Sequence, residues 1–293
     1  MSDDRYDPKP VEIPEDDESF YERPFFAYGH FKKGQLAYCK IADCVDDVAH
    51  DEVPFKMHIR DGVPTIKKKN SRFRTMGHRI YFANGKEEEA YSIISNTELG
   101  NYYKWDTVDI GGETFNVLTT ENLEGTFVDV DGDGKYIGEY DGRNDPFFFK
   151  APQFIRNELE NIDYDDECFI FRIQMYYMLL WSAIDRYCTL KYDISKSQGD
   201  YLKALSEDEA FLSALYSIKP EERDAVRSAR NEHPLYFNLN RPNFILNFYY
   251  TIRCNVVHRG KERGNNMEGL IMSLNDMLDI FDKLIENTFG ADE

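Results

Sequence analysis

The sequence has few cysteines and no pairing pattern among them. Five cysteines are spread over 293 residues, none of them in a C-x-x-C pair: Cys39, Cys44, Cys168, Cys188 and Cys254. Disulfide scaffolds and tetrahedral zinc sites need a regular set of closely spaced ligands, so this spacing argues against both classes. Reduced thiols in a cytoplasmic protein fit the pattern better.

Long apolar runs are also missing. No stretch approaches the ~18–20 apolar residues that cross a bilayer. The first residues, Met1-Ser-Asp-Asp-Arg-Tyr-Asp-Pro8, lack the basic and apolar regions of a secretory signal. We therefore expect no membrane partner and a cytoplasmic location.

Positive charge is scarce, because 35 Lys and Arg stand against 54 Asp and Glu and give a net charge of −19. This balance argues against a general affinity for nucleic acid, although it leaves room for a local basic site. A salt-loving host would produce a similar acidity, and the composition does not show whether the host is of this kind.

The length predicts about two domains. Residues 1–19 hold eight acidic residues, two basic residues and three prolines without any periodicity, which predicts a disordered acidic tail. We expect a first domain over 20–120, an Asp- and Gly-rich connector over 121–151, and a second domain over 152–293.

The first domain has the texture of short strands. Runs at 24–29 and 77–82 read as strands, and Gly111-Gly112 joins two further strands over 107–118 into a hairpin. A helix-like segment at 86–94 interrupts them. Strands mixed with few helices predict a small, barrel-like α+β domain.

The second domain has helical periodicity. Apolar residues recur every three or four positions over 169–187, 245–256 and 270–285. A shorter helix is expected over 201–216, and Pro220 is placed to begin another. These segments predict an all-α bundle.

One candidate site combines a Tyr-Gly turn with a distant carboxylate. Tyr28, Gly29 and His30 end the first strand, where glycine allows backbone amides to face outward and bind an anion. Glu98 lies about seventy residues later in Asn96-Thr-Glu-Leu-Gly-Asn-Tyr-Tyr103, before a strand. If Glu98 is buried, desolvation raises its pKa toward the range useful for a general acid or base.

These motifs resemble the gamma-glutamylcyclotransferase-like family. The likeness covers about residues 24–120 and includes Ala-Tyr-Gly-x-Phe-Lys-x-Gly, Arg60-Asp-Gly-Val-Pro64 and Glu-x-Gly-x-Tyr. It implies that Tyr28, Gly29 and His30 bind the carboxylate end of a gamma-glutamyl group. It also implies that Glu98 moves a proton while the amine closes onto the carbonyl and releases 5-oxoproline. The segment 56–79 departs from such a substrate, because its eight Lys and Arg against one Asp suit a polyanion.

The second candidate site is Arg253 with His258, near the end of an apolar helix. The two residues are five apart, which is about 140° on an ideal helix, so they do not share one stripe. They would converge if the helix unwound near His258, or if a second copy supplied the matching pair. A basic cluster follows at Arg259, Lys261 and Arg263. A neutral imidazole can take a proton from a ribose 2′-hydroxyl, and a guanidinium can bind phosphate oxygens.

Residue spacing alone also fits a structural role, with Arg253 paired to a carboxylate and His258 at the end of a helix. However, Arg-x4-His followed by Arg-Gly-Lys resembles the HEPN superfamily of helical domains, over about residues 165–288. This resemblance implies a dimer in which two Arg-x4-His pairs make one RNase site that needs no metal. Asn255 is the polar residue between the arginine and the histidine of each pair. Cys254 stands where many active members carry Asn, Asp or His.

A weak calcium motif lies in the connector. Asp129, Asp131 and Asp133 occupy the first three ligand positions of an EF-hand loop, but its twelfth position holds Tyr140 instead of a glutamate. We expect a turn-rich loop and no metal or other cofactor.

The sequence therefore predicts an α+β protein in which a small β-barrel-like gamma-glutamylcyclotransferase-like domain precedes an all-α HEPN-like bundle. The favoured function is a metal-independent endoribonuclease of a microbial defence or toxin–antitoxin system, acting on RNA as a homodimer formed through the helical domain. The first domain would then sense a small-molecule ligand or guide the substrate. Arg253, His258 and Asn255 would be catalytic, and Arg259, Lys261 and Arg263 would bind substrate. One alternative is a cyclotransferase that uses Glu98. The other is a non-catalytic interaction or scaffold protein.

Overall fold

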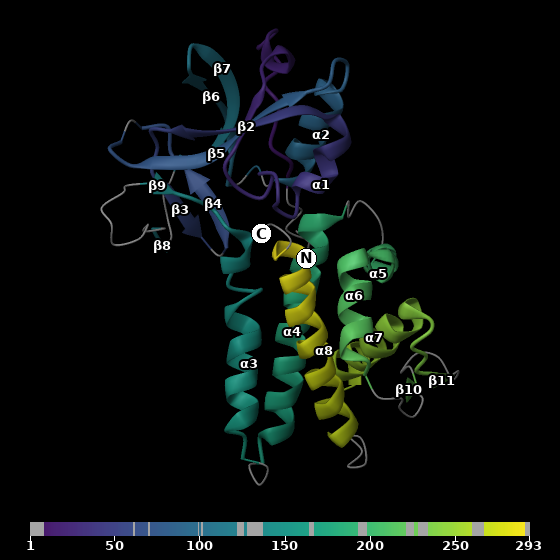
Figure 1. Cartoon of the computed structure of the whole chain (residues 1–293). Helices are drawn as coiled ribbons and strands as arrows, with labels where there is room; N and C mark the ends of the chain where they lie inside the picture. Colours follow the sequence, from purple (N-terminus) through teal and green to yellow (C-terminus); the bar gives the residue numbers. More distant parts are fainter. Residues whose placement is uncertain are drawn as a thin grey trace, which may run out of the picture. The chain divides into compact units, whose positions relative to one another are not determined.

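The computed structural model (Figure 1) describes most of the chain in two separate units. The described residues are 9–60, 62–69, 71–98, 100, 102–121, 126–127, 137–163, 167–192, 198–220, 226–227, 234–259 and 267–290. The first unit ends at Asp145 and the second begins at Pro146.

Among its described residues, the first unit contains strands and two α-helices. Its strands are β1 (Phe25–Ala27), β2 (Val45–Val53), β3 (Met57–Arg60), β4 (Val63–Ile66), β5 (Arg74–Phe82), β6 (Lys104–Ile110), β7 (Glu113–Thr119), β8 (Thr126–Phe127) and β9 (Ile137–Gly138). Its helices are α1 (Tyr38–Ile41) and α2 (Glu87–Thr97). The expected strands near 24–29 and 77–82 and the expected helix near 86–94 are therefore confirmed.

The main sheet has the strand order β2-β5-β1-β7-β6, and β9 pairs in parallel with β5. The predicted hairpin is present as β6 and β7, with Ile110 opposite Glu113. Its two turn residues, Gly111 and Gly112, have φ angles of 62° and 92°. Two successive positive φ angles are what a tight hairpin turn requires, and glycine adopts them without strain.

The main sheet is open, so the expected barrel is not formed. Within the described residues, the end strands β2 and β6 each pair with one neighbour only, β5 and β7. A second sheet of order β4-β3-β8 packs on one face of the main sheet, and α2 packs on the other. Both faces are covered by other elements, so the apolar residues are buried without barrel closure.

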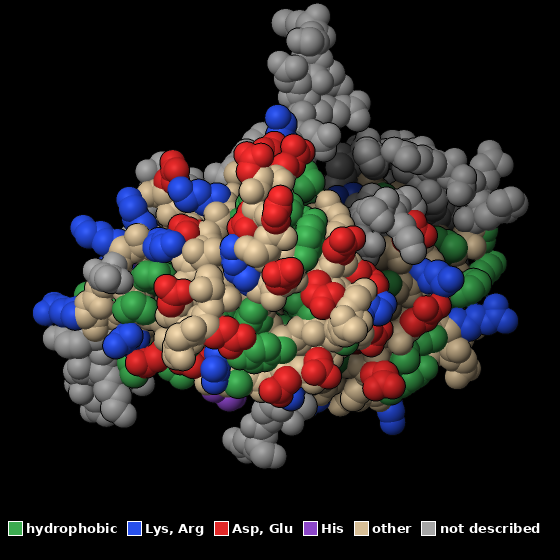
Figure 2. Space-filling model, turned by 90° about the horizontal axis from the view of Figure 1, so that it is seen from above, with side chains coloured by type: hydrophobic (Ala, Val, Ile, Leu, Met, Phe, Trp, Pro, Cys, Tyr) green, Lys and Arg blue, Asp and Glu red, His purple; other side chains and the backbone are tan. Residues whose placement is uncertain are grey.

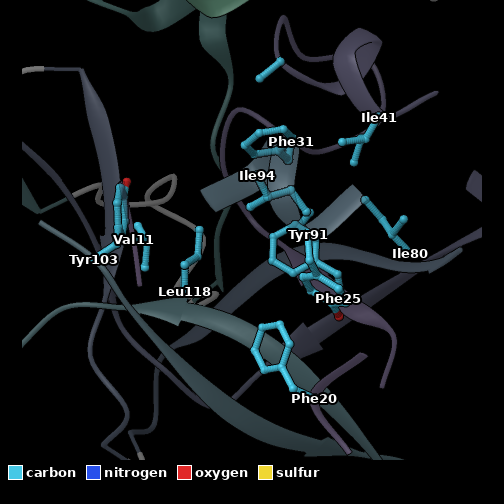
Figure 3. Packing of buried hydrophobic residues seen from close by; sticks show 12 residues of the cluster. Val11, Phe20, Phe25, Phe31, Ile41, Ile80, Tyr91, Ile94, Tyr103 and Leu118 are labelled. Carbon is cyan, nitrogen blue, oxygen red and sulfur yellow. The ribbon is translucent and has the colours of Figure 1, made fainter. Parts of the chain in front are cut away.

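The side chains of β1 alternate between the two faces of the main sheet, and both faces are apolar. Phe25 and Ala27 point into the core beneath α2, whereas Phe26 belongs to the core beneath the second sheet. Figure 3 shows the α2-side cluster, in which Tyr91 and Ile94 of α2 meet side chains from the strands.

Residues 9–19 differ from the expected disordered tail, because part of this segment is anchored in the first unit. Val11 is buried, and its N–H donates to the Ser95 carbonyl at 3.0 Å. Asp17 accepts a hydrogen bond from Arg23 at 3.0 Å. Burial of Val11 and the bond between Asp17 and Arg23 together anchor this stretch.

The segment 121–151 also differs from a simple connector. Its strands β8 and β9 pair with β3 and β5 of the first unit. These are contacts over long sequence separations, which local composition does not reveal.

The second unit is helical, as predicted. Its helices are α3 (Lys150–Glu160), α4 (Phe169–Lys191), α5 (Gln198–Glu207), α6 (Glu209–Ile218), α7 (Pro242–Arg259) and α8 (Met267–Phe289), with a short pair of strands β10 (Val226–Arg227) and β11 (Pro234–Leu235). Helices α3, α4 and α8 run side by side (Figure 1). The α+β fold class is thereby confirmed.

The single helix expected over 201–216 is instead two helices, α5 and α6. Asp208 breaks it with an extended backbone, and its carboxylate accepts hydrogen bonds from the N–H groups of Ala210 and Phe211 at 2.9 and 3.2 Å. An aspartate in this position caps a new helix rather than continuing the old one. The helix expected to begin at Pro220 falls on 221–225, outside the described residues.

Candidate functional site

Residues of the Tyr-Gly turn and Glu98 meet at one small cavity in the first unit. Tyr28, Gly29 and His30 follow β1, and Glu98 is the residue that ends α2. The cavity is lined by Phe25, Ala27, Tyr28, Gly29, His30, Phe31, Pro64, Glu98, Tyr103 and Leu118. Its free space is about 20 Å³, enough for about one water molecule.

Tyr28 is a fixed hydrogen-bond donor at this cavity. Its hydroxyl donates to the Leu118 carbonyl at 2.8 Å. Burial and the nearby Glu98 carboxylate both raise the pKa of Tyr28 well above its ordinary value. The half-buried Glu98 is held in turn by its backbone N–H, which donates to the Ile94 carbonyl at 3.0 Å.

Pro64 of β4 closes the cavity over Gly29. A Cβ added at Gly29 would lie 2.7 Å from Pro64 Cγ, so only glycine fits there without a shift of the ring. Tyr103 fixes Pro64 from the other side, since its hydroxyl donates to the Pro64 carbonyl. The cavity is therefore assembled but small.

Tyr140 is a residue of this region that sequence reasoning did not assign to it. Its hydroxyl lies 3.0 Å from His30 Nδ1, and the two buried rings meet edge to face at 4.9 Å. The buried Lys32 Nζ donates to the Tyr140 carbonyl at 3.0 Å and to Glu139 at 2.6 Å. Pairing of β9 with β5 brings this segment beneath the Tyr-Gly turn. The only signal in the sequence was a tyrosine within an acidic, glycine-rich stretch.

The N-terminal strap, residues 9–11, holds both sides of Glu98. Val11 donates to Ser95 in α2, and the Gly100 N–H donates to the Lys9 carbonyl at 2.8 Å. A Cβ added at Gly100 would lie 2.6 Å from the Pro10 carbonyl oxygen. The strap therefore requires glycine at position 100.

We expect Gly100→Ala to lower the free energy of unfolding by about 1–3 kcal/mol, because the added methyl group displaces backbone. Urea denaturation measures this loss. Gly269→Ala is the matched control, since its added Cβ meets nothing within 4 Å on helix α8, and it should gain about 0.5–1 kcal/mol. Equal stability of Gly100→Ala and the wild type would contradict the strap contact.

The second candidate site centres on Arg253 of α7. The half-buried guanidinium lies 5.6 Å from the centre of the Tyr250 ring, and the ring of Trp181 on α4 meets Tyr250 edge to face at 5.6 Å. Arg253 Nε and Trp181 Nε1 are buried and have no hydrogen-bond partner within the described residues. Arg253 also forms no ion pair with any carboxylate in that part of the chain.

Tyr250 sits between opposite charges. Burial is the largest of the effects that together raise the pKa of Tyr250 to about 12; a hydrogen bond with Cys254 and the Asp185 carboxylate also raise it, while Arg253 acts to lower it. Asp185 is already bonded, because it accepts from the Tyr201 hydroxyl at 2.7 Å. The tyrosine thus stays protonated beside the guanidinium at neutral pH.

Helix α7 continues through position 258 without unwinding. Arg253 and His258 therefore stay about 140° apart around the helix and about 7.5 Å apart along it. Asn255 is half-buried on the same helix. The side chains of His258 and Arg259 lie outside the described residues, as do Lys261 and Arg263 altogether.

The calcium candidates Asp129, Asp131 and Asp133 also lie outside the described residues. Elsewhere in the chain, among the residues the structure describes, no group of three or more His, Cys, Asp or Glu side chains is arranged to hold a metal ion. None of the described helices is long and apolar enough to span a membrane.

Comparison of the chain with the profiles of known families, with curated proteins and with solved structures gives no match. The two sites above are therefore interpreted from their own chemistry.

Proposed function

We propose that this protein is a metal-independent endoribonuclease whose active site forms between two copies of α7. His258 is the general base and Arg253 the group that binds the phosphate. Asn255 orients the reacting residues. The proposal follows the resemblance of Arg-x4-His to the HEPN superfamily.

The observation that carries the proposal is Arg253, whose guanidinium forms no ion pair within the described residues and whose buried Nε has no hydrogen-bond partner there. A buried donor without a partner costs about 1–3 kcal/mol. A bound phosphate would supply the missing acceptor, since phosphate oxygens are strong acceptors for guanidinium. The alternative role for Arg253, a structural ion pair, has no carboxylate to support it within the described residues.

Helix α7 runs unbroken through positions 253 and 258, which favours a site shared between two copies of the chain. Because positions 253 and 258 lie about 140° apart around one helix, we expect a phosphate bound to Arg253 of one copy to be met by His258 of the other. A two-fold symmetric pair of helices provides two such sites, each combining Arg253 of one copy with His258 of the other.

The reaction balances without a metal. His258 accepts the proton of a ribose 2′-hydroxyl, the 2′-oxygen bonds to phosphorus, and the bond from phosphorus to the 5′-oxygen breaks. The imidazolium formed in this step then gives the proton to that 5′-oxygen. Arg253 stabilises the charge on the phosphate oxygens during the displacement. The products carry 2′,3′-cyclic phosphate and 5′-hydroxyl ends.

The test is cleavage of mixed RNA by the purified full chain in EDTA, with end analysis of the products. We expect cyclic phosphate ends from the wild type and intact RNA with His258→Ala. The assignment would be overturned by cleavage that persists in His258→Ala. It would also be overturned if the wild type cleaved RNA without EDTA but not with it.

A second candidate is a cyclotransferase in the first unit. The observation in its favour is that Tyr28, Gly29, His30 and Glu98 line one cavity, as the family resemblance implies for a gamma-glutamyl site. The size of the cavity weighs against it, because room for about one water does not admit a gamma-glutamyl group until Pro64 moves.

If this second activity exists, Glu98→Gln should lower the release of 5-oxoproline from a gamma-glutamyl amide by about 10²–10⁴-fold, since general acid–base catalysis contributes that much. Thr97→Ser, a change at the adjacent residue, serves as the control and should retain the rate. Equal release by Glu98→Gln and the wild type would exclude Glu98 as the proton carrier.

A further inference from the structure

The first unit carries a cluster of cations that neither candidate site uses. We call it the basic loop cluster, and its members lie just before β3 and between β4 and the start of β5: Lys56, Lys67, Lys68, Lys69, Arg72 and Arg74. The chain as a whole has a net charge of −19. Acidic side chains are spread over the face in Figure 2, with Lys and Arg among them.

The fold brings these cations together. Met57 pairs with Ile66 at the end of the β3–β4 ladder, so Lys56 and Lys67 occupy the next pair of positions across the strands. The loop then returns to the start of β3, where the Ser71 N–H donates to the Pro54 carbonyl at 2.9 Å.

An aromatic ring holds two of the cations in place. Lys56 Nζ lies 5.0 Å from the centre of the Phe73 ring, and the Arg72 guanidinium lies 5.4 Å from it. Each such contact contributes about 0.5–1 kcal/mol at an exposed site. The two charges are thereby kept beside one another.

The cluster is only partly neutralised. Lys68 pairs with Asp106 at 2.7 Å and Arg74 with Glu52 at 3.5 Å. The exposed side chains of Lys67 and Lys69 form no ion pair within the described residues. Lys67 adds only a smaller effect to that of Lys104, which is the main cause of the lowered pKa of Glu121.

We propose that the basic loop cluster binds the backbone of single-stranded RNA. The inference rests on the proposed nuclease function, because a chain of such negative charge repels RNA unless a local cation surface draws it in. Lysine and arginine bind phosphates regardless of sequence, so the cluster would hold the substrate without selecting the cleavage site.

The test measures binding apart from cleavage. A fluorescein-labelled single-stranded RNA of mixed sequence is titrated with full-length His258→Ala protein in EDTA, from about 0.05 to 0.2 M KCl, the range over which phosphate binding is strongly salt-dependent. Adding Lys67→Glu and Lys69→Glu should weaken binding about tenfold or more. It should also reduce the slope of log affinity against log salt by about 1.4, at about 0.7 for each phosphate that the protein no longer neutralises.

The matched control is Lys150→Glu with Lys203→Glu, two exposed lysines of the second unit. This pair changes the net charge by the same amount and should leave the affinity within about twofold. Equal losses in both double variants, an unchanged affinity in the first, or equally tight binding of an acidic peptide would overturn the proposal. Binding that depends on the cluster supports it, and a wild type that binds but does not cleave would refute the nuclease function alone.

Discussion

Mixing Arg253→Ala chains with His258→Ala chains is expected to restore about a quarter of the wild-type rate of RNA cleavage, although each variant alone is nearly inactive. Each single change should lower the rate by about 10²–10⁴-fold, because one removes the general base and the other the transition-state charge partner. The mixture recovers because one copy contributes the arginine and the other the histidine.

The expected fraction follows from two-fold symmetry. Random exchange of subunits makes about half of the dimers mixed, and each mixed dimer keeps one of its two combined sites, which gives about a quarter of the full rate. The continuous helix from Pro242 to Arg259 is the reason for expecting this arrangement, since it places positions 253 and 258 about 140° apart within a single copy.

Wild type mixed with the double variant Arg253→Ala/His258→Ala supplies the control. If the sites are shared, only wild-type dimers are active and about a quarter of the rate remains; if each chain has its own site, about half remains. A mixture of the single variants that stays as inactive as its components would show that the site is not shared. Recovery also shows that both variants are folded, which matters because Arg253 is half-buried.

Local patterns in the sequence predicted local structure well. The Gly111-Gly112 hairpin and the long helices α4 and α8 follow from turn chemistry and apolar periodicity, both of which act over a few residues. The Tyr-Gly turn and Glu98 were placed at one site by resemblance, and they line one cavity. Spacing alone would not have joined residues seventy positions apart.

Contacts that depend on distant strands were missed for a physical reason. Lys32 reads as a surface residue, yet β9 brings Glu139 and the Tyr140 carbonyl to its ammonium group and allows it to be buried. Likewise, nothing near Val11 in the sequence indicates that α2 will accept its N–H. Such burial depends on tertiary partners, and local propensity carries no information about them.

The pair of histidines on β2 and β5 is another contact of this kind. His50 and His78 are opposite each other in the ladder. His78 Nδ1 accepts the Lys33 N–H at 3.0 Å, so the proton of the neutral ring is on Nε2 and points to His50 Nδ1, also at 3.0 Å. Charging His78 would require a second proton where the backbone N–H already points.

We therefore expect the first unit to lose stability as the pH falls from about 6.5 to about 4. Burial, followed by the charges of His50 and Lys32, lowers the pKa of His78 from 6.5 to about 4. In this window the unfolded chain binds a proton that the folded chain excludes, so the free energy of unfolding falls with decreasing pH. The full difference is about 3 kcal/mol, at about 1.4 kcal/mol for each pH unit between the two pKa values.

The measurement is urea denaturation of the full chain carrying Trp181→Phe, which leaves Trp105 as the only tryptophan. Trp105 reports on the first unit because its ring packs against Phe20 and Tyr91. His78→Gln should be less stable at pH 7.5, because the fit is poorer, yet nearly independent of pH between 6.5 and 4. His50→Gln keeps an acceptor for His78 and should retain most of the slope, since burial is the largest cause of the shift. If His78→Gln loses as much stability on acidification as its parent, other groups must be responsible for the acid sensitivity.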